Sequence, residues 1–168
     1  MKAAIFGIFA SLLLVGNVYA EEKDEGESGS NLPRMVSLRS DHINARSGPG
    51  ARYPIDWIYM QKGAPVEIIA EFELWRKIKD WEGSETWVHK SMLSGKRTAK
   101  IISPGEVNVY AKPDYRSKVT AKAEEGSVGT LEKCPSDIDL CKMKFDRSIE
   151  GWVSRTNLFG LYDKEEVK

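Results

Sequence analysis

The sequence predicts an all-β protein made of two small β-barrels in tandem. One sequence unit occurs twice between Met35 and Tyr162, its segments alternate apolar and polar residues with a period of two, and no segment there shows a convincing helical period. Several short strands in about 60 residues favour a small, strongly bent barrel, because flat sheets of that size would leave long unpaired edges.

The chain begins with the features of a secretory signal peptide. The positive Lys2 precedes an apolar run from Ala3 to Gly16, and the small residues Val18 and Ala20 follow it. A membrane anchor is the alternative, but the run is short for a bilayer, which needs about 20 residues. We therefore expect residues 1–20 to be removed after Ala20. The mature protein would be periplasmic or secreted, without stable insertion in a membrane.

The segment after the signal is predicted to be a disordered acidic leader. Residues 21–34 are rich in acids, Ser and Gly and contain almost nothing to bury. The rest of the chain intersperses both signs of charge, and the full sequence has a net charge of zero. It lacks the basic stripe that nucleic-acid binding requires, so we expect no nucleic-acid partner.

The first unit, residues 35–97, reads as a series of short strands separated by glycines. Alternation is clearest around Val66 and Ile68, and "KSML" is predicted to form one turn of 3₁₀ helix. The strands expected in this unit are Met35–Arg39, His42–Arg46, Ile55–Met60, Pro65–Phe72, Leu74–Lys79 and Thr86–His89.

The second unit, residues 98–162, carries the landmarks of the first in the same order, and residues 163–168 form a tail. The matching pairs are Asn44 and Asn108, Pro49 and Pro113, Arg52 and Arg116, Trp87 and Trp152, and Leu93 and Leu158. The strands expected here are Lys100–Ile102, Val107–Ala111, Lys118–Lys122, Val128–Lys133, Leu140–Phe145 and Gly151–Arg155, and "RTNL" again predicts a 3₁₀ turn. Because the connection "GKRTAK" is short, we expect the two units to dock on each other.

Two cysteines, Cys134 and Cys141, flank the turn between consecutive strands of the second unit. An even number of cysteines in an exported chain favours a disulfide. A metal site is the alternative, but it needs four good ligands, and His42 and His89 lie in separate strands. A disulfide would help a barrel this small, which buries too little surface to be strongly stable alone.

These residues make the chain resemble tandem bacterial SH3-like proteins, in the exported form found in alphaproteobacteria. The motifs that carry the resemblance are "INARSGPGARYP" and "TWVHKSMLSGKR". It covers Met35 to about Glu165 and is weaker in the second unit, where Arg46-Ser47-Gly48 is replaced by Tyr110-Ala111-Lys112. The resemblance implies two SH3-like β-barrels and a binding or scaffolding role outside the cytoplasm. Related modules bind cell-wall peptides or accompany cell-wall hydrolases.

In such a barrel the Gly- and Pro-rich stretch is an arched loop beside a groove. Gly48 and Gly50 can take positive φ at little cost, while Pro49 and Pro54 fix φ and stiffen the arch. Arg46 and Arg52 bracket this arch. An arginine grips a carboxylate with two parallel hydrogen bonds, which suits the termini of peptides. The alternative is that both are solvated loop charges or pair with a nearby aspartate.

Aromatic residues crowd the first unit and suit extended peptides or sugars. Tyr53, Trp57 and Trp75 are the candidates for a ligand groove, with the interface between the barrels and the barrel core as alternatives. Trp87 is predicted to belong to the core.

The sequence contains no recognisable catalytic motif: there is no Ser-His-Asp spacing, no His-Glu-x-x-His and no Gly-rich phosphate loop. We therefore expect no enzyme activity, no cofactor and no metal. The predicted function is that of a non-catalytic exported binding or scaffold protein whose partner is a cell-wall peptide or an envelope protein. The alternatives are a cell-envelope hydrolase or its accessory, and a module that self-associates through Trp57 and Trp75.

Overall fold

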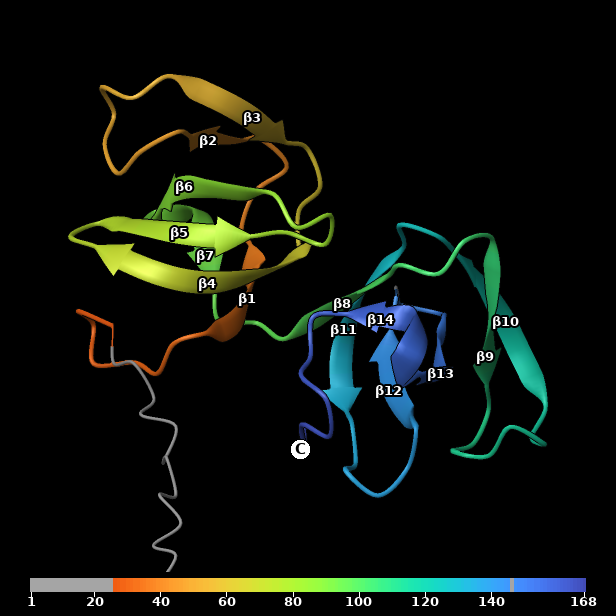
Figure 1. The fold of residues 1–168 in the computed structure, drawn as a ribbon. Coiled ribbons are helices and arrows are strands. Elements are labelled where there is room, and N and C mark those ends of the chain that lie inside the picture. Colours follow the sequence, from red (N-terminus) through yellow and green to blue (C-terminus); the bar gives the residue numbers. More distant parts are fainter. Residues whose placement is uncertain (1–25, 146) are drawn as a thin grey trace, which may run out of the picture.

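A computed structural model describes residues 26–145 and 147–168, so the predicted signal peptide and the start of the predicted leader lie outside it. The described chain forms two seven-stranded antiparallel sheets and no α-helix, which confirms the all-β prediction (Figure 1). Two single-turn 3₁₀ helices, η1 (Lys90–Met92) and η2 (Arg155–Asn157), lie where the sequence predicts them.

The first sheet has the strand order β3-β2-β6-β5-β4-β1-β7. Its strands are β1 (Arg34–Leu38), β2 (Ile43–Arg46), β3 (Ile55–Tyr59), β4 (Pro65–Phe72), β5 (Trp75–Lys79), β6 (Glu85–His89) and β7 (Leu93–Ser94). The second sheet has the equivalent order β10-β9-β13-β12-β11-β8-β14. Its strands are β8 (Thr98–Ile101), β9 (Glu106–Tyr110), β10 (Val119–Glu124), β11 (Val128–Lys133), β12 (Leu140–Lys144), β13 (Glu150–Ser154) and β14 (Leu158–Phe159).

The internal repeat appears in the register of the strands as well as in their order. In the first sheet Arg46 of β2 lies opposite Trp87 of β6. In the second sheet Tyr110 of β9 lies opposite Trp152 of β13, which is the same position of the repeated unit. The change between the sheets falls between Ser94 and Thr98, beside the predicted boundary at residue 97.

Each sheet bends around its own hydrophobic core. Val66 and Ile68 of β4 and Val88 of β6 are buried in the first core, as their alternation predicts. Trp87 is half-buried on the opposite face of β6 from Val88, so its assignment to the core was wrong. Leu131 and Met143 belong to the separate core of the second barrel.

The predicted disulfide joins Cys134 and Cys141 across the connection from β11 to β12, with a Cα–Cα distance of 4.3 Å. Both residues are fully buried. The C-terminal tail packs against the same point, because Val167 exchanges two backbone hydrogen bonds with Cys134 at 2.8 and 3.0 Å.

The described part of the predicted leader, residues 26–33, is held against the first barrel and is not disordered. The backbone N–H and the hydroxyl of Ser28 both donate to the carboxylate of Glu71, at 2.7 and 2.9 Å. The backbone N–H of Glu73 donates to Glu27 at 2.7 Å. The composition of the segment could not predict these contacts, because their partners, Glu71 and Glu73, lie more than 40 residues further along the chain.

The two barrels contact each other through polar side chains. The ammonium group of Lys100 on β8 lies 3.4 Å from the ring centroid of Trp81 and donates to Gln61 at 2.9 Å. The amide of Gln61 donates in turn to the backbone carbonyl of Gly126 at 2.9 Å. Tyr162 donates to Glu67 at 2.9 Å. The expectation that the units dock agrees with these contacts.

A search of the described residues finds no helix of the length and apolar character that crossing a bilayer would require.

Candidate ligand-binding edge of the first barrel

Strand β3 lies at the edge of the first sheet and pairs only with β2 within that sheet. Three apolar side chains of β3, and that of Met60 directly after it, are exposed to solvent. Ile55, Trp57, Ile58 and Met60 are between 45% and 67% exposed. We call these residues, Ile55, Trp57, Ile58 and Met60, the apolar edge.

The pairing of β2 with β3 explains how the apolar edge is presented. Trp57 lies opposite the buried Ala45, and Ile58 lies opposite the exposed Asn44. Successive side chains of a strand point to opposite faces of the sheet. The side chains of Trp57 and Ile58 therefore lie on opposite faces of the β2–β3 pair. Figure 1 shows β3 as the outermost strand of the first sheet. Trp57 and Ile58 are 48% and 45% exposed, although Ala45 and Tyr59 are buried on the inner face of the same two strands.

The arch between β2 and β3, residues 47–54, is closed by its own contacts. The guanidinium of Arg46 donates to the backbone carbonyl of Tyr53 at 2.7 Å, and the backbone N–H of Ser47 donates to Pro54 at 3.2 Å. The Tyr53 ring lies against Gly48, and the Arg52 guanidinium is 5.3 Å from its centroid. The arch is therefore a stiff wall next to the start of β3.

Gly48 and Gly50 serve this arch differently from the prediction. Neither has a positive φ, although six other described glycines do. A Cβ atom on Gly48 would collide with the ring of Tyr53, and one on Gly50 would approach that ring to 3.3 Å. Glycine is needed at these two positions because the Tyr53 ring packs directly on the backbone. A left-handed backbone conformation is not the reason, since neither φ is positive.

The five predicted groove residues do not gather in one place. Arg46 and Tyr53 are half-buried in the arch, Arg52 is exposed on it, and Trp57 lies on β3. Trp75 lies on β5, separated from β3 in the sheet by β2 and β6, and its ring packs edge-to-face on His89 at 5.6 Å. The guanidinium of Arg46 is engaged inside the arch by the carbonyl of Tyr53, a role that neither the groove prediction nor its alternatives included.

The second barrel shows what an ordinary edge looks like at the same positions. Its edge strand β10 carries Ala121 where β3 has Trp57, and Lys122 where β3 has Ile58. The ammonium of Lys122 is paired with Glu106 at 2.8 Å. Charged side chains are the usual protection of an exposed strand against pairing with other chains, and β3 has replaced them with apolar ones.

Sequence reasoning selected Trp57 and missed Ile55, Ile58 and Met60. For Ile58 and Met60 the signal was present in the repeat itself: aligning "DWIYM" with "TAKAE" shows apolar residues where the second unit has Lys122 and Glu124. That comparison required knowing that both segments are edge strands, which only the strand order reveals.

The chemistry available at this edge is non-covalent. An edge strand offers a row of backbone N–H and C=O groups to an added strand, and the apolar side chains offer burial on both sides of it. Among the described residues no group of three or more His, Cys, Asp or Glu side chains is arranged to hold a metal ion.

Residues 39–95 match the family model described as the bacterial SH3 domain, and this range covers β2 to β7 of the first barrel. No curated protein matches the chain. Among solved structures the chain is similar to NlpC2 from Trichomonas vaginalis, with 15% identity, a TM-score of 0.33, and coverage of 76% of this chain and 48% of that one. It is also similar to NlpC1 from the same organism, with 15% identity, a TM-score of 0.33, and coverage of 81% and 48%. The chain thus spans about half the length of these structures.

Proposed function

We propose that this protein is a non-catalytic, exported binding protein that captures an extended peptide along the apolar edge of its first barrel. The bound peptide adds a strand to β3, and its side chains pack on Trp57 and Ile58. The partner is a cell-wall peptide or an extended segment of an envelope protein.

The observation that carries this proposal is the contrast between the two edge strands. Both barrels have the same strand order, and each edge strand begins with an exposed apolar residue, Ile55 or Val119. They differ after that point, because β3 exposes Trp57 and Ile58 where β10 has Ala121 and Lys122. A duplicated fold has no structural need for an apolar edge in one copy. Exposed apolar surface of this kind is typical of an interaction site.

An extended peptide fits the edge better than a folded partner would. Backbone hydrogen bonds supply affinity in strand addition, and alternate side chains supply specificity. The arch adds Arg52, which is exposed and available to a carboxylate on the peptide. A match to the bacterial SH3 domain over the first barrel supports a binding role for that unit.

The test replaces the apolar edge with its counterpart from the second barrel, in the double variant Trp57→Ala/Ile58→Lys. Both side chains are about half exposed, so the fold should be retained. Binding is measured by co-sedimentation with purified peptidoglycan and by calorimetry with soluble stem peptides. Loss of a buried aromatic anchor costs about 2 kcal/mol or more, which is roughly a 30-fold loss of affinity.

The matched control is Phe72→Ala/Leu74→Lys, which removes two apolar residues of similar exposure from the β4–β5 turn. It should bind as the wild type does. Equal binding by wild type and edge variant would contradict the proposal. Release of cell-wall fragments by the purified protein would contradict a non-catalytic role. Light scattering tests a further outcome. If the wild type forms a concentration-dependent dimer and the edge variant does not, the ligand of the apolar edge is a second copy of the chain and not a peptide.

A further inference from the structure

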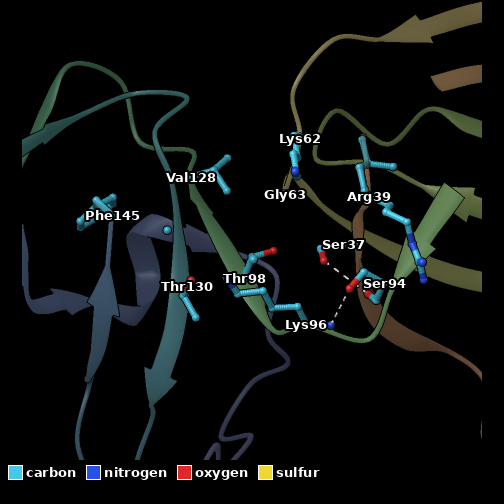
Figure 2. Close-up of a pocket in the computed structure, with 12 residues that line it drawn as sticks. Ser37, Arg39, Lys62, Gly63, Ser94, Lys96, Thr98, Val128, Thr130 and Phe145 are labelled. Carbon is cyan, nitrogen blue, oxygen red and sulfur yellow. Dashed lines mark hydrogen bonds between the residues drawn. The ribbon is translucent and has the colours of Figure 1, made fainter. Parts of the chain in front are cut away.

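A cleft of about 360 Å³ lies between the two barrels, away from the apolar edge. Figure 2 shows side chains of the first barrel facing those of β8 and β11 across an open space. The cleft is lined by Ser37, Leu38, Arg39, Lys62, Gly63, Ser94, Lys96, Thr98, Val128, Gly129, Thr130 and Phe145.

The charge of this cleft is of one sign. Arg39, Lys62 and Lys96 line it, and none of the described residues that line it is Asp or Glu. Arg39 is held in place because its guanidinium donates twice to the backbone carbonyl of Leu93, at 3.0 and 2.9 Å. Like charges gathered in a concave site focus a positive potential, which favours an anion.

Hydroxyl groups complete the polar lining. Ser37 donates to the backbone carbonyl of Ser94 at 3.3 Å, and Thr130 faces them from β11. Thr98 is 5% exposed, and its hydroxyl oxygen is buried without a hydrogen-bond partner among the described residues.

The cleft is too large for an inorganic ion and is not purely polar. A water molecule occupies about 30 Å³ in the liquid, so the space admits an organic ligand. Val128 and Phe145, which are half-buried, provide apolar surface beside the cations. A ligand that matches this lining carries an anionic group next to a small apolar one.

Contacts between the barrels hold the loop that carries Lys62 in place before any ligand binds. Gln61 is fixed on both sides, by the ammonium of Lys100 and by the carbonyl of Gly126. Lys62 follows it directly in the chain, so the loop that carries this lysine is anchored to the second barrel. The cleft is thus formed without a ligand, which reduces the entropic cost of binding.

We infer that the cleft between the barrels is a second binding site, specific for a short peptide that ends in a free carboxylate. The terminal carboxylate lies between Lys62 and Lys96, and the last side chain packs on Val128 and Phe145, while Arg39, whose guanidinium is bonded to the Leu93 carbonyl, adds positive charge at longer range. This inference is independent of the binding proposed at β3, because the two sites share no residue.

The test uses acetyl-Ala-Ala as the probe, with a free C-terminal carboxylate in one arm and a C-terminal amide in the other. Binding to the full mature chain is followed by the amide resonances of Gly63 and Gly129, which line the cleft. We expect saturable shifts with the free acid, at least tenfold weaker binding of the amide, and weaker binding in about 0.5 M salt.

The variant Lys62→Gln/Lys96→Gln removes two exposed cations and should lower the affinity for the free acid at least tenfold. The matched control Lys112→Gln/Lys118→Gln removes two exposed cations from the arch of the second barrel and should bind normally. The edge variant Trp57→Ala/Ile58→Lys should also retain this binding, which separates the two sites.

Three outcomes would overturn the inference. Equal binding of acid and amide would show that the carboxylate is not recognised. Unchanged affinity of the Lys62→Gln/Lys96→Gln variant would place the bound peptide elsewhere. Inorganic phosphate binding tenfold more tightly than the peptide at the same resonances would identify a phosphate site in place of a peptide site.

Discussion

Glu71 is the main polar residue that ties the start of the described chain to the first barrel. Its side chain is fully buried, accepts from Arg34 at 2.5 Å and from the backbone N–H of Ser28 at 2.7 Å, and forms an ion pair with Arg76 at 3.0 Å. Burial alone would raise the pKa of this carboxyl, but the donors outweigh it and lower the pKa of Glu71 to about 2. Glu71 therefore helps to hold residues 26–33 in place, together with the hydrogen bond from Glu73 to Glu27.

The substitution Glu71→Gln tests this anchoring through its dependence on pH. The folded pKa of about 2 lies below the ordinary value of 4.5, so the carboxylate stabilises the fold above about pH 4.5 and loses this effect as the pH falls towards 2. A shift of this size corresponds to about 3 kcal/mol at neutral pH. We expect urea denaturation at pH 7 to show a loss of about 2 to 3 kcal/mol that shrinks towards pH 2.

The control for this prediction is Glu73→Gln, an exposed carboxylate on the adjoining turn. It should change the free energy of unfolding by less than about 0.5 kcal/mol at either pH. A loss in Glu71→Gln that is the same at pH 7 and pH 2 would mean that shape, and not charge, holds the segment.

Single residues were also where prediction from the sequence failed. Trp87 was assigned to the core because it recurs as Trp152, but in both barrels the buried residue is the following valine, Val88 or Val153. Alternation fixes which residues share a face and leaves open which face is the inner one. Large aromatic residues bias that choice, and here the bias was misleading.

At the scale of elements, the arch between β2 and β3 depends on a close approach of ring and backbone. The substitution Gly48→Ala should lower the free energy of unfolding by about 1 to 3 kcal/mol, because the new methyl group collides with Tyr53. Gly50→Ala is the matched control: its methyl group would meet the same ring at 3.3 Å and should cost less. Thermal unfolding monitored by circular dichroism measures both, and equal effects would contradict this account of the arch.

Most strands were predictable, because local alternation and Gly or Pro punctuation mark them. The predicted strand at 65–72 matches β4, and both 3₁₀ turns occur as expected. The two-residue strands β7 (Leu93–Ser94) and β14 (Leu158–Phe159) were not predicted, since two residues show no period. The apolar edge was only partly predicted. Whether a strand lies at the edge depends on the order of the strands in the sheet, which local sequence patterns do not contain.

At the scale of the whole molecule, the repeat predicted two barrels, but the repeat could not predict how they meet. The junction uses Gln61, Trp81 and Lys100, and these residues belong to different positions of the repeated unit. A contact between unlike parts leaves no periodic trace in the sequence. The docking itself was inferred from the short linker, which limits how far two bodies can separate.

The Lys100 junction provides the last prediction, that the two barrels move as one body because of this side chain. Lys100 is buried between them, and burial lowers the pKa of its ammonium group, yet Trp81 and Gln61 surround it. A desolvated cation–π contact is worth about 2 kcal/mol. The variant Lys100→Met keeps the bulk and removes the charge, so it should weaken docking without unfolding either barrel.

Residual dipolar couplings measure this directly. In the wild type one alignment tensor should fit the amides of both barrels, whereas in Lys100→Met the two barrels should need tensors of different magnitude. Lys122→Met, on the exposed edge strand β10, is the matched control and should keep a single tensor. A single tensor in Lys100→Met would mean that the remaining contacts, from Tyr162 to Glu67 and from Gln61 to Gly126, suffice to hold the barrels together. The cleft between the barrels would then keep its shape without this lysine, and acetyl-Ala-Ala binding should be unaffected by the substitution.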